Sequence, residues 1–256
     1  MQTEHIFSPS NTKKMLSIYY TAGYPTLDST LPIAEKLETI GIDFLEIGFP
    51  YSDPVADGPV IQHSSEVALK NGMNLKTLFE QLKDLRKRVS IPVFLMGYCN
   101  PVLQYGVENF CKSCQEVGVN GVIIPDLPMY EYEELYQDIF ERYGISNVFL
   151  VTPQTSEERI RKIDTLSTSF IYLLSSNATT GKTLEVKDTS EAYFKRLKDM
   201  RLQHPLVIGF GISSAQTFQK ATDYANGAIV GSAFVKLLAE EDYESQILPF
   251  IQSIRK

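Results

Sequence analysis

One acidic side chain lies in the middle of an apolar segment, where it has the surroundings of a proton-transfer residue. Residues 43–48 read Asp-Phe-Leu-Glu-Ile-Gly, and the two-residue repeat of a β-strand places Phe44, Glu46 and Gly48 on the same face. A carboxylate in an apolar interior must be paired, neutralised or used, because isolated ionisation there is very costly. The alternative is a structural ion pair, but no lysine or arginine occupies an inward position of the predicted strands. We therefore predict that Glu46 is a catalytic residue.

The segment that follows, residues 50–64, is predicted to be a rigid loop that carries two more carboxylates. It holds Asp53 and Asp57 together with three prolines and one glycine, and proline restricts φ whereas glycine frees it. Asp-Pro and Asp-Gly are also ordinary turn dipeptides, so both aspartates have a purely structural interpretation. A second carboxylate near Glu46 would instead form a pair whose environments separate the two pKa values.

Glycines late in the chain indicate a phosphate site. One cluster spans residues 209–214 (Gly-Phe-Gly-Ile-Ser-Ser) and another spans residues 231–233 (Gly-Ser-Ala), each after an apolar segment and before a predicted helix. In α/β barrels, backbone N–H groups and helix N-termini after the last two strands bind phosphate. Two ordinary turns are the alternative interpretation.

A long polar segment, residues 176–187, follows the apolar segment that ends in Tyr-Leu-Leu-Ser. Its small and polar residues are typical of a mobile lid that closes over a substrate and excludes water. A plain surface loop is the alternative.

Eight apolar segments alternate with amphipathic ones, which is the pattern of successive βα units. The predicted strands are residues 15–20, 43–49, 92–98, 121–126, 147–151, 169–175, 205–211 and 227–231. The predicted helices are residues 31–40, 75–88, 107–117, 131–143, 157–166, 191–201, 214–222 and 243–254. The length of 256 residues is close to the roughly 250 of one barrel. We predict a single (β/α)8 TIM-barrel domain over residues 1–256, with an extra N-terminal helix or plug and an extra C-terminal helix.

Composition excludes several classes of function. A net charge of −7 and a pI near 5.1 argue against nucleic acid as a partner. The absence of a signal peptide or a long apolar run predicts a cytoplasmic protein without a membrane anchor. Cys111 and Cys114 are spaced one helical turn apart, and with neither a second cysteine pair nor clustered histidines we predict structural thiols and no metal site, with a redox or metal role as the alternative.

Residues 45–62, LEIGFPYSDPVADGPVIQ, closely resemble the signature of the tryptophan synthase alpha subunit family. YLLS with a downstream TG, then GFGIS and GSAFVK, follow in the family's order, and the resemblance runs from the TAGYP segment to the last helix. It implies retro-aldol cleavage of indole-3-glycerol phosphate to indole and glyceraldehyde 3-phosphate, without a cofactor. It also implies an αββα complex with a pyridoxal-phosphate-dependent beta subunit, which the Asp53-Pro54 and Asn100-Pro101 segments would face.

Carried over residue by residue, the resemblance implies that Glu46 is the general acid–base and that Asp57 binds the indole N–H. It further implies substrate contacts from Tyr19, Met96, Tyr172, Thr180, Phe210 and Ile212, and phosphate contacts from Gly181, Gly211, Gly231 and Ser232.

Two departures from the family's pattern affect only the surroundings of the site. Ser176 and Asn177-Ala178 replace an arginine and a glycine that many members have at the start of the lid, and Tyr24 occupies a frequent Asp position. A stand-alone indole-releasing lyase, another phosphosugar barrel enzyme and a non-catalytic subunit are the competing hypotheses. Asp57 and the missing inward lysine argue against a different aldolase, and the two intact carboxylates argue against a non-catalytic role.

Overall fold

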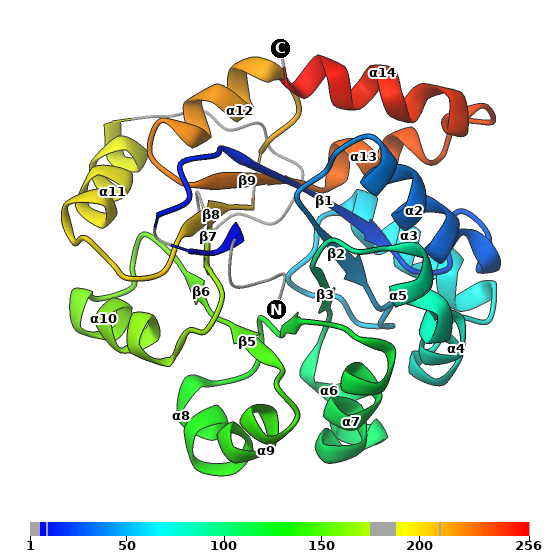
Figure 1. The fold of residues 1–256 in the computed structure, drawn as a ribbon, viewed down its shortest axis with the longest axis horizontal. Coiled ribbons are helices and arrows are strands. Elements are labelled where there is room, and N and C mark those ends of the chain that lie inside the picture. The colour runs from blue at the N-terminus through cyan, green and yellow to red at the C-terminus, as the bar shows by residue number, and fades with distance from the viewer. Residues whose placement is uncertain (1–5, 9, 175–187, 210, 256) are drawn as a thin grey trace.

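The computed structural model describes residues 6–8, 10–174, 188–209 and 211–255, with only the backbone for 188–190. The described strands form one parallel sheet in the order β5-β4-β3-β2-β1-β9-β8-β7-β6, and the sheet curves into a barrel with helices outside it (Figure 1). The strands are β1 (Met15–Thr21), β2 (Phe44–Gly48), β3 (Val93–Met96), β4 (Gly121–Ile123), β5 (Ser146–Val148), β6 (Leu150–Val151), β7 (Ile171–Leu173), β8 (Leu206–Ile208) and β9 (Gly227–Val230). The predicted barrel is confirmed.

The described sheet has nine strands where eight were predicted, because one predicted strand is interrupted at Phe149. The predicted strand 147–151 is divided in two, because β5 pairs only with β4 whereas β6 pairs only with β7. The Phe149 carbonyl still accepts a hydrogen bond from the Tyr172 N–H at 3.0 Å. One short segment of chain therefore provides both ends of the sheet, and its break marks the place where the barrel closes.

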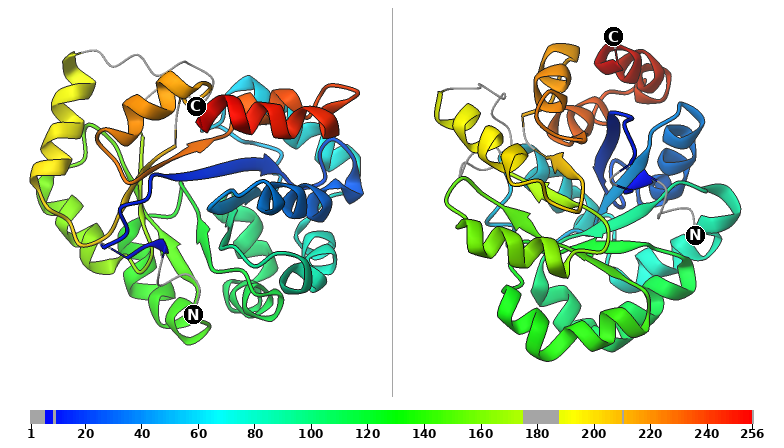
Figure 2. Two further views of the ribbon diagram at one scale, coloured as in Figure 1. Left: turned by 45° about the horizontal axis from the view of Figure 1, so that its top comes forward. Right: turned by 60° about the vertical axis from the view of Figure 1, so that its left-hand side comes forward.

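Helices surround the barrel (Figures 1 and 2). They are α2 (Thr30–Thr39), α3 (Pro59–Lys70), α4 (Leu75–Gln81), α5 (Leu85–Arg88), α6 (Cys99–Tyr105), α7 (Val107–Val117), α8 (Met129–Glu131), α9 (Gln137–Arg142), α10 (Glu157–Leu166), α11 (Asp188–Asp199), α12 (Ala215–Thr222), α13 (Ser232–Leu237) and α14 (Tyr243–Arg255), with single turns at Leu27–Ser29 and Leu82–Asp84 and a π-helical turn at Tyr132–Tyr136. The predicted C-terminal helix is confirmed as α14, which contacts α12 and α13.

The prediction of a loop over residues 50–64 was wrong in its second half. Helix α3 begins at Pro59, and Gly58 before it is extended. Proline suits the first position of a helix because its φ is already helical and its missing N–H would have no partner there. Helix α6 was also missed, since its seven residues are too few to display a helical repeat.

Most predicted helix boundaries are confirmed by their capping residues. The Ser156 and Ser214 hydroxyls accept hydrogen bonds from the third backbone N–H of α10 and of α12. Gly41, Gly118 and Gly144 have φ values of +90°, +83° and +64° just after helices, where a side chain would be strained. These residues shorten the turns that return the chain to the next strand.

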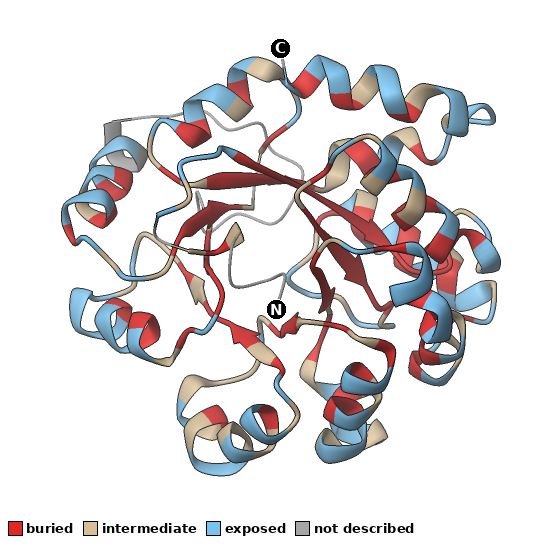
Figure 3. Cartoon of the chain, viewed as in Figure 1, coloured by how far each residue is buried: buried red, intermediate tan, exposed pale blue. Residues whose placement is uncertain are grey.

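A cluster of phenylalanines fills the barrel near the amino ends of the strands. Phe7, Phe44, Phe94 and Phe170 make mutual ring contacts with centroids 5.1–5.9 Å apart, and each is buried. Figure 3 shows the strands as the main buried layer. The predicted N-terminal plug is confirmed for Phe7, whereas residues 1–5, part of the predicted helix, lie outside the described residues. This end of the barrel is therefore closed to ligands.

Two other sequence expectations concern the outer layer. Cys111 and Cys114 are free and fully buried on α7, and burial raises the pKa of both thiols, that of Cys111 to about 12. Such thiols are poor nucleophiles, as the structural interpretation expects. Within the described ranges, none of the helices has the length and apolar character that a membrane crossing demands.

We expect Phe170→Ala to lower the free energy of unfolding by about 3–5 kcal/mol, because a ring with three aromatic neighbours would be replaced by a cavity. Urea denaturation followed by circular dichroism measures the change. Tyr130→Ala, at a side chain that is 61% exposed, is the control and should change it by no more than about 0.5 kcal/mol. Equal effects of the two variants would contradict the proposed packing.

Candidate active site

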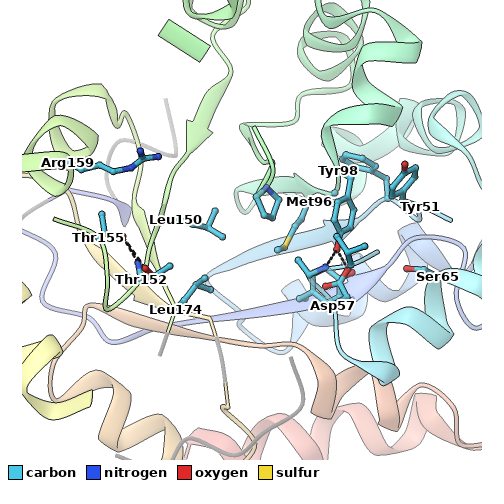
Figure 4. A pocket seen from close by; sticks show the side chains of 16 residues that line it. Tyr51, Asp57, Ser65, Met96, Tyr98, Leu150, Thr152, Thr155, Arg159 and Leu174 are labelled. Carbon is cyan, nitrogen blue, oxygen red and sulfur yellow. Dashed lines mark hydrogen bonds between the residues drawn. The ribbon is translucent and has the colours of Figure 1, made fainter. Parts of the chain in front are cut away.

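A cavity of about 590 Å³ opens at the carboxyl ends of the strands, the end where barrel enzymes have their active sites (Figure 4). Its volume falls in the usual range of small-molecule sites, roughly 300–1,000 Å³. The described residues that line it are Tyr19, Phe49, Tyr51, Val55, Ala56, Asp57, Ser65, Met96, Gly97, Tyr98, Pro125, Leu150, Thr152, Thr155, Arg159 and Leu174. Aromatic and aliphatic side chains predominate, so the cavity suits a mostly apolar ligand with a few polar contacts.

Glu46 lies one step deeper than these lining residues. It pairs in register with Tyr19 on β1 and with Phe94 on β3, so it separates the cavity from the phenylalanine cluster. The side chain is fully buried, and neither carboxyl oxygen has a hydrogen-bond partner among the described residues. Burial raises the pKa of Glu46 well above its ordinary value. Burial without a hydrogen-bond partner therefore favours the neutral form of the acid.

Asp57 has a different environment. It lies in the loop between β2 and α3, partly exposed to the cavity, and its Oδ2 accepts a hydrogen bond of 2.9 Å from the Tyr98 hydroxyl. Burial raises the pKa of Asp57 to about 6, and the hydrogen bond from Tyr98 acts in the opposite direction. Asp57 is therefore mostly ionised near neutral pH, whereas burial favours the neutral form of Glu46.

The two carboxyl groups act on the same pair of phenols. After burial, which is the largest cause, the charges of Asp57 and Glu46 both raise the pKa of Tyr19 and that of Tyr172. Tyr19 comes from β1 and Tyr172 from β7. Because both phenols feel both carboxyl groups, Glu46 of β2 and Asp57 of the following loop face the same central space. The structure thus brings together Glu46, Asp57, Tyr19 and Tyr172, as the sequence predicts.

Two glycines make room for these phenols. A Cβ atom on Gly48 would lie 2.2 Å from the Tyr19 Oη, and one on Gly209 would lie 1.9 Å from the Tyr172 Cζ and Oη. Real Cβ atoms do not approach other atoms so closely. The Tyr172 hydroxyl also donates a hydrogen bond of 3.2 Å to the Gly209 carbonyl. Gly48 and Gly209 therefore determine how far each ring extends over the barrel.

The remaining predicted substrate residues are distributed unevenly. Met96 lines the cavity beside Tyr19, whereas Ile212 is buried and is not among the lining residues described above. Asp53 is exposed and lines a separate hollow between its own loop and α3. The structure therefore separates Asp53 from Asp57, which turn chemistry alone left equivalent and which only the resemblance distinguished. Four predictions lie outside the described residues: Thr180, Gly181, Phe210 and the lid 176–187.

The two predicted phosphate-binding turns, before α12 and before α13, differ in whether side chains already bond their backbone N–H groups. At α12, the Ser213 and Ser214 N–H groups both donate to the Thr217 hydroxyl, and the Ser214 hydroxyl accepts from the Thr217 N–H. At α13, Gly231 precedes Ser232 without a side-chain cap. Helix first-turn N–H groups without a cap are suited to bind an anion. Of the two helix ends, α13 is the better candidate, whereas Gly211, at φ +77°, lies four residues before α12.

Tyr98 was not predicted from the sequence. It lies two residues after the end of β3, lines the cavity and contacts Asp57. The signal was present, because Tyr98 is two residues after Met96 and strand alternation places both on one face. Arg159, Thr152 and Thr155, on the opposite side of the cavity in Figure 4, were missed as well, since they follow the irregular strand break at Phe149.

The raised pKa of Glu46 predicts a pH-dependent stability. Above its ordinary value of 4.5 the unfolded chain releases a proton that the folded chain retains, so stability falls as pH rises toward the raised folded pKa. We expect Glu46→Gln to have a higher melting temperature than the native chain at about pH 8 and a smaller advantage at about pH 4. Melting curves over this range provide the measurement.

Glu66→Gln is the matched control for this prediction. The Glu66 carboxylate is exposed and bonded to Lys70, which lowers its pKa, so its removal should give no rising advantage with pH. Parallel melting profiles for native chain and Glu46→Gln would contradict the assignment of a neutral buried acid.

Comparisons with known proteins identify relatives over nearly the whole chain. A family model described as "Tryptophan synthase alpha chain" matches residues 8–252. The tryptophan synthase alpha chain of Christiangramia forsetii is 54% identical over 242 residues, 94% of each chain. That of Flavobacterium psychrophilum is 56% identical over 242 residues, which are 94% of this chain and 95% of the relative.

Solved structures give the same result. A mutant tryptophan synthase alpha-subunit from Pyrococcus furiosus superposes with a TM-score of 0.86 at 34% identity, covering 97% of this chain and 98% of that one. A chain of tryptophan synthase from M. tuberculosis in an aminoacrylate-bound form superposes with a TM-score of 0.85 at 27% identity, covering 99% and 98%.

Proposed function

This chain belongs to the tryptophan synthase alpha chain family, a family of lyases that cleave indole-3-glycerol phosphate to indole and glyceraldehyde 3-phosphate, and we propose that Glu46 and Asp57 catalyse this reaction here. The observation that supports the proposal is the difference between the two carboxyl groups. One is buried and neutral, and the other is partly exposed and mostly ionised. Two environments that separate two pKa values are the usual basis for assigning an acid and a charge stabiliser.

In the first step, the neutral Glu46 donates its proton to C3 of the indole ring. The ring nitrogen then carries the positive charge, and its N–H is the donor that faces Asp57. An ionised Asp57 stabilises this cation more than it stabilises the neutral substrate, which is the requirement for catalysis. Water exclusion in the apolar cavity strengthens the interaction.

In the second step, the Glu46 carboxylate removes the proton from the hydroxyl group on the adjacent glycerol carbon. That oxygen forms the aldehyde, the carbon–carbon bond breaks, and its electron pair neutralises the ring cation to give indole. Glu46 ends protonated as it began, so no water or added base is consumed. General acid–base catalysis of this kind contributes about 100- to 10,000-fold to a rate.

The rest of the cavity would hold the two ends of the substrate. Tyr19, Met96 and Tyr172 would provide the apolar surroundings that an indole ring needs, and Ile212 is buried as well. The phosphate would meet backbone N–H groups of Gly211, Gly231 and Ser232, helped by the dipole of α13. Thr180, Gly181 and Phe210 keep their predicted roles, as does the lid.

The chain works with a partner. Tryptophan synthase alpha chains bind the beta subunit in an αββα complex, and pyridoxal phosphate belongs to the beta subunit, so the alpha chain needs no cofactor of its own. We propose that the partner covers Asp53-Pro54 and Asn100-Pro101, where Val55 is 81% exposed and Leu103 is 47% exposed. Exposed apolar side chains near the cavity suit transfer of an apolar product to a neighbour.

Two further features belong to the proposal. We propose that residues 1–256 form one barrel domain, and a single sheet with strands from both halves of the chain supports this. The protein acts in the cytoplasm, where tryptophan biosynthesis takes place.

We expect Glu46→Gln to abolish indole formation, because it removes the group that transfers the proton. We expect Asp57→Asn to reduce indole formation at least about 100-fold, because it removes the charge that stabilises the ring cation. Free indole released from indole-3-glycerol phosphate measures turnover, and circular dichroism checks the fold. Glu66→Gln and Asp84→Asn, at exposed carboxylates outside the cavity, are matched controls that should retain full turnover. Retention of most of the turnover by Glu46→Gln would eliminate the mechanism.

A titration with beta subunit separates a complex-dependent enzyme from a stand-alone lyase. We expect the rate of substrate cleavage to rise with added beta subunit and to saturate, since the partner surface lies beside the loop that carries Asp57. The measurement is the rate of glyceraldehyde 3-phosphate production. A high rate without partner that does not change on its addition would support the stand-alone alternative.

A further inference from the structure

The Tyr98 hydroxyl bonds both the backbone and a carboxylate of the loop between β2 and α3. We infer that Tyr98 is a positioning residue, which orients Asp57 toward the ligand N–H and favours its ionised form. The inference rests on the proposed role of Asp57 and adds a residue that the family signature at 45–62 does not contain.

Two hydrogen bonds connect this hydroxyl to the loop. The Tyr98 O–H donates to the Asp57 Oδ2 at 2.9 Å, and the Tyr98 oxygen accepts from the Ala56 N–H at 3.0 Å. A hydroxyl has one proton. Because the Ala56 N–H can only donate, it occupies a lone pair of the oxygen and leaves the proton for Asp57. The arrangement therefore requires Asp57 to be an acceptor at Oδ2, and it leaves Oδ1 for the ligand.

The phenol that makes these bonds is itself well held. Tyr98 is 6% exposed, precedes α6 as its N-cap, and packs against the Tyr51 ring with centroids 5.3 Å apart. On the other side of the loop, the Gln62 amide donates to the Asp57 carbonyl at 2.8 Å. The Asp57 carboxylate is thus held by Tyr98, which follows β3 (Figure 4), and the Asp57 carbonyl is held by Gln62 of α3.

The surroundings of Asp57 contain several other ionisable groups. The groups that face it, or line the same cavity, are Tyr19 from β1, Glu46 from β2, Tyr51 from the loop before it, Tyr98 after β3, Tyr172 from β7 and Arg159 from α10. Among these, Tyr98 is the one that donates a hydrogen bond to the carboxylate. Its removal should therefore change the ionisation of Asp57 directly.

The direction of that change follows from the contact. Burial raises the pKa of Asp57 to about 6 and the Tyr98 hydrogen bond lowers it, so loss of the hydroxyl moves the pKa further upward. The ionised form then appears at higher pH. Both indole affinity and the acid limb of kcat/KM should shift with it.

Indole binding gives a direct assay, because the chain contains no tryptophan. Indole fluorescence, excited where tyrosine does not absorb, reports the ligand alone. For the native chain we expect indole affinity to rise as Asp57 ionises. For Tyr98→Phe we expect the midpoint of that rise to move upward by about one pH unit, the usual size for one hydrogen bond to a charged group. The acid limb of kcat/KM for indole-3-glycerol phosphate should move equally.

Tyr51→Phe is the matched control. It removes the same atom from the same cavity, but the Tyr51 hydroxyl accepts from the Asn100 amide at 3.2 Å instead of contacting Asp57. Its midpoint should match that of the native chain. A merely structural role of Tyr98 would lower affinity at every pH without moving the midpoint, and that result would overturn the inference.

Asp57→Asn separates the inference from the proposed function. If Tyr98 acts through Asp57, Asp57→Asn removes the pH-dependent rise, and adding Tyr98→Phe to it changes affinity little. If Asp57→Asn leaves turnover intact, the proposed function fails. If Asp57→Asn is inactive yet Tyr98→Phe keeps the native midpoint, the inference alone fails.

Discussion

The burial of one carboxyl group without a partner is the constraint on which the site depends. Glu46 lies at the boundary between a sealed phenylalanine cluster and an open cavity, where it is fully buried and has no hydrogen-bond partner among the described residues. Its surroundings therefore favour the neutral form, which is the form that the proposed proton transfer to carbon needs. The same isolation costs folding free energy, which the packed barrel around it must offset. Active sites often sacrifice stability in this way.

The neighbouring residues keep Glu46 buried and add a second carboxyl group, Asp57, which ionises more readily. Gly48 and Gly209 allow Tyr19 and Tyr172 to extend over the barrel interior, where larger residues would displace them. Asp57 approaches from a loop and keeps one oxygen bonded to Tyr98, so it ionises more readily than Glu46 does. The barrel thus holds two carboxyl groups with different environments at one end, because burial and hydrogen-bond donors differ between them.

Much of the architecture was predictable from local patterns, because each pattern reports one face of one element. The strand segments, Glu46 on an inward face and the N-caps Ser156 and Ser214 follow from strand alternation and from helix-end chemistry. The errors arose where local signals are weak. Helix α3 lies within a segment rich in turn residues, and the break at Phe149 depends on two different partner strands. Pairing partners are not encoded in the spacing of a single segment.

The sequence by itself determined the family and the barrel and named Glu46 and Asp57 as candidates, since these depend on residue types and on short repeats along the chain. Only the tertiary structure decided that Asp57 enters the cavity while Asp53 faces a separate hollow, and that a hydroxyl 41 residues away bonds to Asp57. The path of a loop between two strands settles such contacts. That path depends on packing against α3, α6 and the end of β3 together, which no local pattern contains.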